Sequence, residues 1–316
     1  TITVPDEYST IQEAIDAANP GDTIFVRAKT YCENITVDKT IFLIGESRRN
    51  TIIDGNEIGT VVNVTASGVV INGFTIRNGG SAGSGIYAYG CADVTVRNNT
   101  IASNEYGIYL SMCNNCTVDG NSIAANMYWG VYIMDTSHNN TISGNDIANN
   151  YGAIYTDASD NNTIYSNCIT NNEYYGIFLS SSNNSTISEN NVVSNGPSFS
   201  MGYGIHFGAA HNNTISKNNI VDNTIGLYFS SSDSNQIIGN NITNSWYGVQ
   251  ISSGSHNIIH HNNFINNRRQ TYDYYGESVW DDGYPSGGNY WSDYSGIDLF
   301  YGSAQNLTGS DGIGDI

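Results

Sequence analysis

Short apolar segments recur along most of the chain with a period of about 22 to 25 residues, three segments to each period. Each is rich in β-branched residues and bounded by Asn, Gly or Ser, which is typical of strands and not of helices. The central residues of the first segment are Ile71, Val96, Val118, Ile142, Ile164, Ile187, Ile215, Ile237 and Ile259. Those of the second, five residues later, are Ile76, Ile101, Ile123, Ile147, Ile169, Val192, Ile220, Ile242 and Phe264. Those of the third are Ile86, Ile108, Val131, Ile154, Ile177, Ile205, Leu227 and Val249. Three strands per period, stacked turn on turn, predict a parallel β-helix.

Asparagine occupies two further columns of the same repeat. One column, two residues before the second segment, holds Asn99, Asn121, Asn145, Asn167, Asn190, Asn218, Asn240 and Asn262. The other, three residues after it, holds Asn104, Asn126, Asn150, Asn172, Asn195, Asn223 and Asn267, with Ser245 in one turn. Asn tolerates the left-handed backbone of a tight turn, and its amide both donates and accepts. Because stacked turns lie about 4.8 Å apart, we expect these amides to hold successive turns together.

Both ends of the repeat region predict caps. Thr10 and Glu13 form a capping-box pattern, and residues 11–18 carry an apolar stripe. A short amphipathic helix there would cover the open end of the β-helix. The predicted regions are an N-terminal cap at 1–22, a β-helix of about 10–11 turns at 23–267, and an acidic, aromatic, Gly-rich C-terminal cap at 268–316.

Several segments also carry a family resemblance. The segments TIQEAIDAA at 10–18 and PGDTIFV at 20–26, followed by Thr30, Tyr31 and Glu33, are similar to the pectin-lyase-like superfamily. That resemblance implies an all-β, right-handed parallel β-helix. The repeats look most like the NosD-like group, whose name refers to periplasmic copper binding, and like archaeal surface proteins with the same repeats. The segments 280–294 and 309–315 resemble the C-terminal signature of those surface proteins.

Charge limits the classes of partner. The 316-residue chain has a formal net charge of −19 at pH 7, and Lys217 is the only basic residue between Arg97 and Arg268. We therefore expect no nucleic acid partner, and the same argument disfavours an anionic polysaccharide. No run of 18 apolar residues is present, so no membrane span is expected. Potential N-glycosylation sites outside the repeat are Asn34, Asn63 and Asn306. Acidity, few lysines and these sites favour an exported, extracellular protein of the cell surface.

Two of the five cysteines occupy equivalent positions in consecutive repeats. Cys91 and Cys113 each lie five residues before a first-segment residue. Stacking would bring their Cα atoms to about 4.8 Å, within the range of a disulfide. We predict a Cys91–Cys113 disulfide, with two stacked free thiols as the alternative. A mass shift on reduction and alkylation distinguishes the two.

Aromatic residues mark one outward side of the third strand. The residue after each third-segment centre points outward, and in most turns it is aromatic: Tyr87, Tyr109, Tyr132, Tyr155, Phe178 and Tyr228. A second set, beside the preceding Gly, includes Trp129, Tyr175 and Tyr247. We refer to these nine residues as the aromatic face. Stacking between strands, a glycan surface and a protein contact all fit this pattern. An exposed strip of this size is unusual on a monomer and favours packing against another subunit.

Metal binding has two sources of support. Acidic residues between glycines at the C-terminus suit Ca²⁺, which takes six to eight oxygen ligands; the predicted ligands are Asp293, Asp298, Asp311 and Asp315. A solvated acidic cap is the alternative, and no organic cofactor is expected. The NosD-like resemblance implies copper, which would need converging histidines. His206 and His211, and His256, His260 and His261, are close in sequence, but we expect all of them to be polar turn residues.

The resemblance to a superfamily that contains lyases, hydrolases and esterases raises the question of catalysis. No arginine lies between Arg97 and Arg268, and no polygalacturonase-like Asn-Thr-Asp or Gly-His-Gly motif is present. Asp135 and Asp157, from neighbouring turns, are the carboxyl groups that could form a glycosidase pair. On balance the sequence predicts a non-catalytic structural protein that assembles with copies of itself or with other surface proteins as a surface layer, sheath, filament or adhesin. The alternative is a carbohydrate-binding or carbohydrate-active protein, lyase- or hydrolase-like, that uses the same aromatic face.

Overall fold

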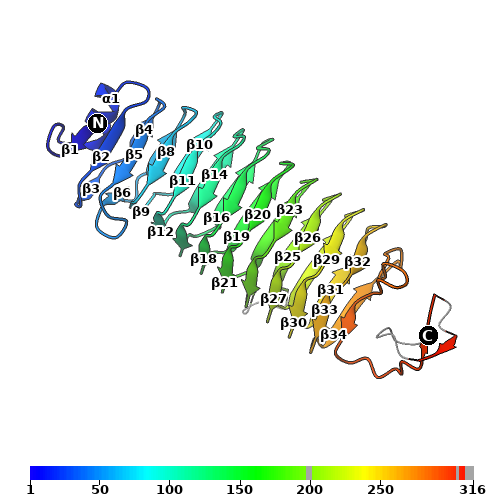
Figure 1. Ribbon diagram of the computed structural model, residues 1–316. Helices are drawn as coiled ribbons and strands as arrows, with labels where there is room; N and C mark the ends of the chain where they lie inside the picture. Colours follow the sequence, from blue (N-terminus) through cyan, green and yellow to red (C-terminus); the bar gives the residue numbers. More distant parts are fainter. Residues whose placement is uncertain (197–200, 304–305, 310–316) are drawn as a thin grey trace.

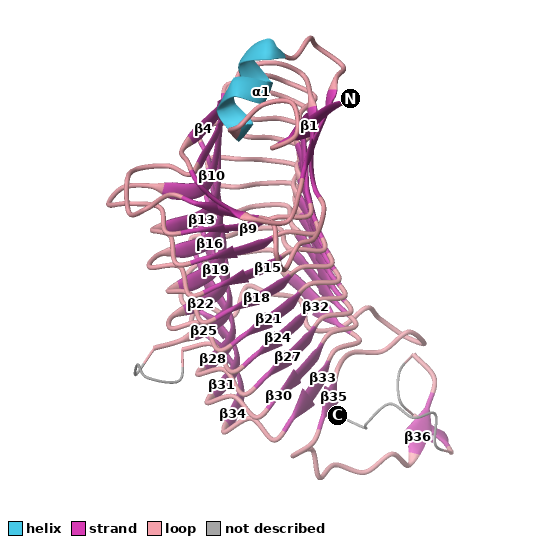
Figure 2. Ribbon diagram, turned by 90° about the vertical axis from the view of Figure 1, so that its left-hand side faces the viewer, coloured by secondary structure: helices cyan, strands magenta, loops and turns pink. Residues whose placement is uncertain are grey.

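The computed structural model describes residues 1–196, 201–303 and 306–309. These residues form a long coil in which three parallel sheets run side by side from the N-terminal to the C-terminal end (Figures 1 and 2). The sheets, here named A, B and C, contain 12, 12 and 11 strands. The predicted all-β parallel β-helix with three strands per turn is confirmed.

Sheet A contains the first apolar column. Its strands are β1 (Ile2–Val4), β2 (Thr23–Val26), β5 (Phe42–Gly45), β8 (Val70–Asn72), β11 (Thr95–Arg97), β14 (Thr117–Asp119), β17 (Thr141–Ser143), β20 (Thr163–Tyr165), β23 (Thr186–Ser188), β26 (Thr214–Ser216), β29 (Gln236–Ile238) and β32 (Ile258–His260). The register places column residues opposite one another, as in the pair Val96 and Val118. Their side chains are buried, because one side of each short strand faces the inside of the coil.

Sheet B contains the second apolar column. Its strands are β3 (Thr30–Cys32), β6 (Ile52–Asp54), β9 (Thr75–Arg77), β12 (Thr100–Ala102), β15 (Ser122–Ala124), β18 (Asp146–Ala148), β21 (Cys168–Thr170), β24 (Asn191–Val193), β27 (Asn219–Val221), β30 (Asn241–Thr243), β33 (Asn263–Ile265) and β35 (Tyr290–Trp291). Each three-residue strand has a buried central residue, such as Ile147 in β18, and in most of these strands its two neighbours point outward.

Sheet C has the longest strands and carries the third column. Its strands are β4 (Ile35–Val37), β7 (Val62–Val64), β10 (Ser84–Tyr89), β13 (Tyr106–Ser111), β16 (Trp129–Met134), β19 (Gly152–Asp157), β22 (Tyr175–Ser180), β25 (Tyr203–Gly208), β28 (Ile225–Ser230), β31 (Tyr247–Ile251) and β34 (Arg269–Asp273). From β10 to β28 each strand has six residues, so its outward side offers a wider surface than that of sheets A and B.

The ends differ from the prediction in one respect. Helix α1 (Ile11–Ala17) has the predicted capping box and lies across the N-terminal opening with Ile11, Ala14 and Ile15 buried (Figure 2). However, β1 precedes α1 and pairs with β2, and β34 and β35 extend sheets C and B beyond residue 267. The coil therefore has about 12 turns instead of the predicted 10–11, because both predicted caps contribute strands. Beyond it, β36 (Phe300–Tyr301) and β37 (Leu307–Thr308) form a small antiparallel pair.

The asparagine ladders are present as predicted. In the first column Asn145 Nδ2 donates to Asn167 Oδ1 over 2.9 Å, while Asn145 Oδ1 accepts from the backbone N–H of Asn121. A ladder that the sequence reasoning missed runs before sheet A, as in the bond from Asn213 Nδ2 to Asn235 Oδ1. These amides are buried and satisfied, so they fix the register of the turns.

Candidate functional site

The aromatic-face residues lie on the outward side of sheet C, where all but Tyr247 are linked by ring contacts; Ile225 separates Tyr247 from Tyr203, and the Tyr247 ring contacts Tyr272. The column that begins with Tyr87 continues through Phe178 to Tyr228, with ring centroids of consecutive turns 4.3–5.2 Å apart. His206 occupies one position of this column. The spacing follows the distance between strands, since each turn contributes one ring.

The rings of this face stack mainly on one another. Tyr132 and Tyr155 are nearly parallel, with an interplanar angle of 8°. Trp129 of the second column stacks on Tyr155 with centroids 4.9 Å apart, over Gly152, where a Cβ atom would collide with the indole ring. Their faces therefore meet along the axis of the coil, while the hydroxyl groups of Tyr109 and Tyr228 donate to Met134 and Ser252 of the next turn. This packing stabilises neighbouring strands and leaves an uncharged aromatic surface on the outward side of sheet C.

Mutual burial keeps this face uncharged. Burial raises the pKa of Tyr109 and of Tyr203 to about 12, and burial lowers the pKa of His206 to about 4. At neutral pH these side chains are therefore uncharged. The phenols act as hydrogen-bonding groups, and neither they nor the imidazole attracts an anion.

We expect an alkaline titration to show this burial directly. Phenolate absorbance of the native protein should include late-titrating groups with a pKa near 12, and Tyr109→Phe should remove one of them. In the unfolded chain a tyrosine phenol has a pKa of about 10. In the folded protein burial raises the pKa of Tyr109 above that value. The stability that the folded protein gains from keeping this phenol uncharged is therefore complete below pH ~10 and is lost as the pH rises toward 12. A native spectrum in which all phenols titrate near pH 10 would contradict the packing.

Two aspartates lie at one edge of this face. Asp135 follows β16, and Asp157 ends β19. The register pairs Ile133 with Thr156, so the two aspartates belong to consecutive turns and differ by one position along the strand. Ser111 Oγ donates to Asp135 Oδ2 over 2.8 Å. The two strands that carry them are neighbours, about 4.8 Å apart.

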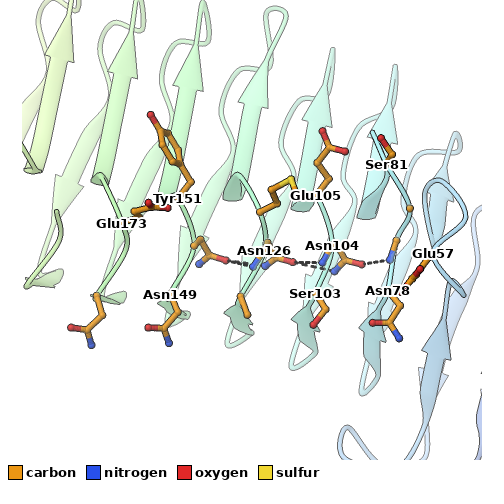
Figure 3. A pocket seen from close by; sticks show the side chains of 16 residues that line it. Glu57, Asn78, Ser81, Ser103, Asn104, Glu105, Asn126, Asn149, Tyr151 and Glu173 are labelled. Atoms are coloured by element: carbon orange, nitrogen blue, oxygen red, sulfur yellow. Dashed lines mark hydrogen bonds between the residues drawn. The ribbon is translucent and has the colours of Figure 1, made fainter. Parts of the chain in front are cut away.

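A groove lies along the opposite edge of sheet C, where the chain passes from sheet B to sheet C. It has a volume of about 1050 Å³ and is lined by residues of consecutive turns from Glu57 to Glu173. The Asn ladder through Asn104 and Asn126 runs along it, with Glu105 on one side (Figure 3). The loops at 55–60 and 78–83 bound its N-terminal end and are joined by a backbone bond from Gly80 to Gly59.

The groove is acidic. Its charged lining residues are Glu57, Glu105 and Glu173, and no Lys or Arg lines it in the described part of the chain. Glu105 and Glu173 follow Asn104 and Asn172, three turns apart, so they are separated by about 14 Å. That is too far for the carboxyl pair of a glycosidase, which requires about 5–9.5 Å. Glu105 and Glu173 therefore offer the groove separate hydrogen-bond acceptors for a polar, extended molecule and not a catalytic pair.

Tyr151 connects the groove with the aromatic face. Its ring stacks on Tyr174 with centroids 5.7 Å apart and meets Trp129 edge-on at 5.9 Å. Sheet C thus has a polar groove at one edge, an uncharged aromatic surface in the middle and an aspartate pair at the other edge.

The other predicted sites have different outcomes. Cys91 and Cys113 are stacked and buried as expected, with their Sγ atoms 3.1 Å apart and no bond between them; the disulfide stays a prediction. Asn63 and Asn306 reach the surface, whereas the amide of Asn34 donates to backbone oxygens of the 58–60 loop. Glycosylation at these three sites also stays a prediction.

In the described part of the structure, the predicted calcium ligands do not lie together. Asp311 and Asp315 lie outside the described residues, and Asp293 Oδ1 accepts a hydrogen bond from Gln270. Asp298 is described but does not belong to a close donor group. Within the described ranges, the close group of three or more metal donors is His260, His261 and Asp282. The sequence reasoning paired these two histidines but missed Asp282, which comes from a non-repetitive loop.

His138 and His211 are turn residues, as expected, whereas the prediction was wrong for His206, which lies in strand β25 and is half-buried among the stacked rings. His138 Nδ1 accepts from the N–H of Asp160, and His211 Nδ1 accepts from the N–H of Asp233. Among the described residues, no helix has the length and apolar character needed to cross a membrane.

Comparison with sequence families gives two matches. Residues 84–223 match the family described as right handed beta helix region. Residues 190–296 match the family described as periplasmic copper-binding protein (NosD). The search of curated proteins found no relative of this chain.

Several solved structures share the fold at low identity. The A-module of a mannuronan C-5 epimerase from Azotobacter vinelandii has a TM-score of 0.66 at 17% identity, with 85% of this chain and 94% of that chain covered. DFA-IIIase from Arthrobacter chlorophenolicus, in complex with GF2, has a TM-score of 0.62 at 12% identity, with 88% and 90% covered. An alginate lyase from a Paenibacillus strain has a TM-score of 0.50 at 16% identity, with 88% and 94% covered.

These comparisons correct two predictions. The prediction of a self-assembling structural protein of the cell surface was wrong, and so was the prediction that the chain is not an enzyme. The similar structures include polysaccharide-active enzymes, an epimerase and a lyase among them, and thus favour the carbohydrate-active alternative. The error came from treating the missing polygalacturonase-like motifs as evidence against any catalysis, although one fold supports many chemistries.

Proposed function

We propose that this chain, a right-handed parallel β-helix protein with NosD-like repeats, binds an uncharged polysaccharide along sheet C and hydrolyses it. The observation that carries the proposal is the aspartate pair on consecutive turns, Asp135 and Asp157, beside the column of aromatic rings on sheet C. The enzyme names of several similar structures support the polysaccharide-active class.

The substrate class follows from charge. Asp135 and Asp157 at one edge and three glutamates at the other give sheet C a negative potential. None of the strands of sheet C from β10 to β28 contains Lys or Arg. A polyuronate would therefore be repelled, and nothing on these strands would neutralise its carboxylates. An uncharged polysaccharide avoids this cost and can donate hydroxyl groups to the carboxylates.

The repeat also fits the shape of such a substrate. Along the axis of the coil, the ring centroids of consecutive turns lie 4.3–5.2 Å apart. An extended chain of pyranose units advances by a similar distance per sugar. Successive sugars would meet equivalent ring edges and hydroxyl groups on successive turns. The neighbouring groove, with its asparagine and glutamate side chains, offers acceptors for branches or for a second strand.

The aspartates would share the two roles of glycoside hydrolysis. One carboxyl group protonates the glycosidic oxygen, and the other acts as the base for water or as the nucleophile. Ser111 holds the Asp135 carboxylate by its 2.8 Å hydrogen bond. Burial raises the pKa of Tyr155, and the neighbouring Asp157 carboxylate raises it further, which keeps this phenol protonated beside the pair.

The direct test is an assay of reducing ends released from a panel of uncharged polysaccharides, with alginate and pectate as the anionic comparison. We expect saturable release from at least one uncharged polysaccharide and none from the polyuronates. Release from polyuronates alone would overturn the substrate class. No release from any member, together with no binding to a glycan array, would overturn the proposed function.

We also propose that the protein works outside the cytoplasm. The NosD family is described as periplasmic, and a polysaccharide substrate would be met there or beyond the cell. Fractionation of cells with an antibody against the chain tests this, and a cytoplasmic pool would contradict it.

A further inference from the structure

The cluster of His260, His261 and Asp282 lies at the C-terminal end of the coil, away from the aspartate pair. One donor atom from each residue lies within 4.8 Å of the other two. His260 is buried, whereas His261 and Asp282 are exposed, so an ion can reach the cluster from solvent. His260 ends strand β32, His261 follows it directly, and Asp282 lies in the segment that follows β34.

The two imidazoles are placed as ligands of one ion would be. His260 Nδ1 and His261 Nδ1 are 3.0 Å apart. Two nitrogens bound to one ion at about 2.0–2.1 Å, at an angle between about 90° and 109°, lie about 2.9–3.4 Å apart. Asp282 Oδ1 lies 4.0 Å from the other ring nitrogen of His260, Nε2, so a rotation of the Asp282 side chain is needed for all three residues to bind an ion at the two Nδ1 atoms.

Neighbouring groups orient these donors. His261 Nε2 is 2.9 Å from the carbonyl oxygen of Ser286, which favours the tautomer protonated at Nε2 and leaves the Nδ1 lone pair free. Ser286 Oγ donates to Asp282 Oδ2 over 2.8 Å and orients the carboxylate. A bound ion would replace the proton that the two Nδ1 atoms otherwise share. Such supporting hydrogen bonds are typical of metal ligands in proteins.

The cluster also joins two parts of the chain. Residues 279–291, here named the closing segment, lie against the last turn: Ile259 N donates to Val279 O, and His261 N donates to Gly288 O. Asn289 accepts from Asn262 and thereby becomes the last rung of the first Asn ladder. Trp291 stacks on Phe264 with centroids 4.6 Å apart and covers the end of the core.

We infer that His260, His261 and Asp282 bind one divalent first-row metal ion that fastens the closing segment to the last turn. Imidazole donors select zinc, copper or nickel over calcium, which needs six to eight oxygens. Copper, named in the description of the NosD family, fits this donor set. The inference is independent of the proposed hydrolysis, because it concerns the cap of the coil and not sheet C.

The first measurement is the binding of zinc to the protein after a chelator has removed any bound metal. The thiols are alkylated beforehand so that they do not bind zinc. Calorimetry should show one site per chain. Asp282→Asn and His261→Gln should each weaken binding by at least about tenfold, the smallest loss typical even of residues that only support a ligand. His211→Gln is the matched control, because His211 is paired with a single carboxylate, Asp233, at 3.3 Å. Its affinity should equal that of the wild type.

Limited proteolysis tests the fastening role. If cleavage in residues 274–288 requires the closing segment to open, free Zn²⁺ at about 100 times Kd should slow it about 100-fold. Asp282→Asn should lose most of this protection at the same zinc concentration. The absence of saturable binding, or binding that both variants leave unchanged, would overturn the site. Binding without slower cleavage would overturn the fastening role.

Discussion

Replacing Asp157 with asparagine is expected to lower kcat for polysaccharide hydrolysis about a thousandfold, within the roughly 10²–10⁴-fold contributed by a positioned acid or base. The amide has nearly the same shape as the carboxylate but neither gives up a proton to the glycosidic oxygen nor activates water. Asp157 is half-buried at the end of β19, and its backbone pairing with β22 is unaffected by the change. The rate of release of reducing ends, compared with thermal unfolding of the same preparation, separates lost chemistry from lost structure.

The partner aspartate and a matched control make this experiment decisive. Asp135→Asn should cause a loss of similar size, and the double variant should be little slower than either single one, because the two groups act as a unit. Asp146→Asn removes an exposed carboxylate from the outward side of sheet B and should leave kcat unchanged. If Asp157→Asn and Asp146→Asn behave alike, the aspartate pair is not the catalytic group.

The repetitive part of the fold could be predicted because each turn repeats the same local rule. An apolar residue at the centre of each strand, asparagine at the corners and one period per turn determine which residues meet, as the pair Ile123 and Ile147 shows. The aromatic face followed from the same alternation, since the residue after each buried centre must point outward. A one-residue shift of register would bury the tyrosines, so the pattern specifies the register strongly.

The non-repetitive parts could not be predicted in this way. The groove depends on loops at 55–60 and 78–83 whose lengths break the period. Asp282 and Asn289 lie in a non-repetitive loop that packs against the last turn. Their contacts with His260 and Asn262 therefore could not be predicted from the repeat spacing. The sequence also could not decide between a structural and a carbohydrate-binding role of the aromatic face, because stacked tyrosines have the same sequence pattern whether they only support the sheet or also bind a ligand.

Replacing Asn145 with alanine is expected to lower the free energy of unfolding by about 4 kcal/mol. In the native structure Asn145 Oδ1 accepts from the N–H of Asn121, and its Nδ2 donates to the carbonyl oxygen of Val118 over 2.9 Å. Alanine leaves the N–H of Asn121 buried without its acceptor, at a cost of roughly 1–3 kcal/mol, and removes the donor bonds to Val118 O and Asn167 Oδ1, which contribute about 0.5–1.5 kcal/mol each. Urea unfolding followed by circular dichroism measures the difference.

The exposed asparagines of sheet B provide the control for this effect. Asn191 is exposed and accepts a 2.7 Å bond from Asn219, so Asn191→Ala exchanges this bond for one to water and should cost less than about 0.5 kcal/mol. Each turn of a solenoid contacts only its neighbours, so a defect in the middle uncouples the two halves. We therefore expect Asn145→Ala also to broaden the unfolding transition. Equal stabilities of the two variants would show that the buried ladder contributes no more than surface pairing does.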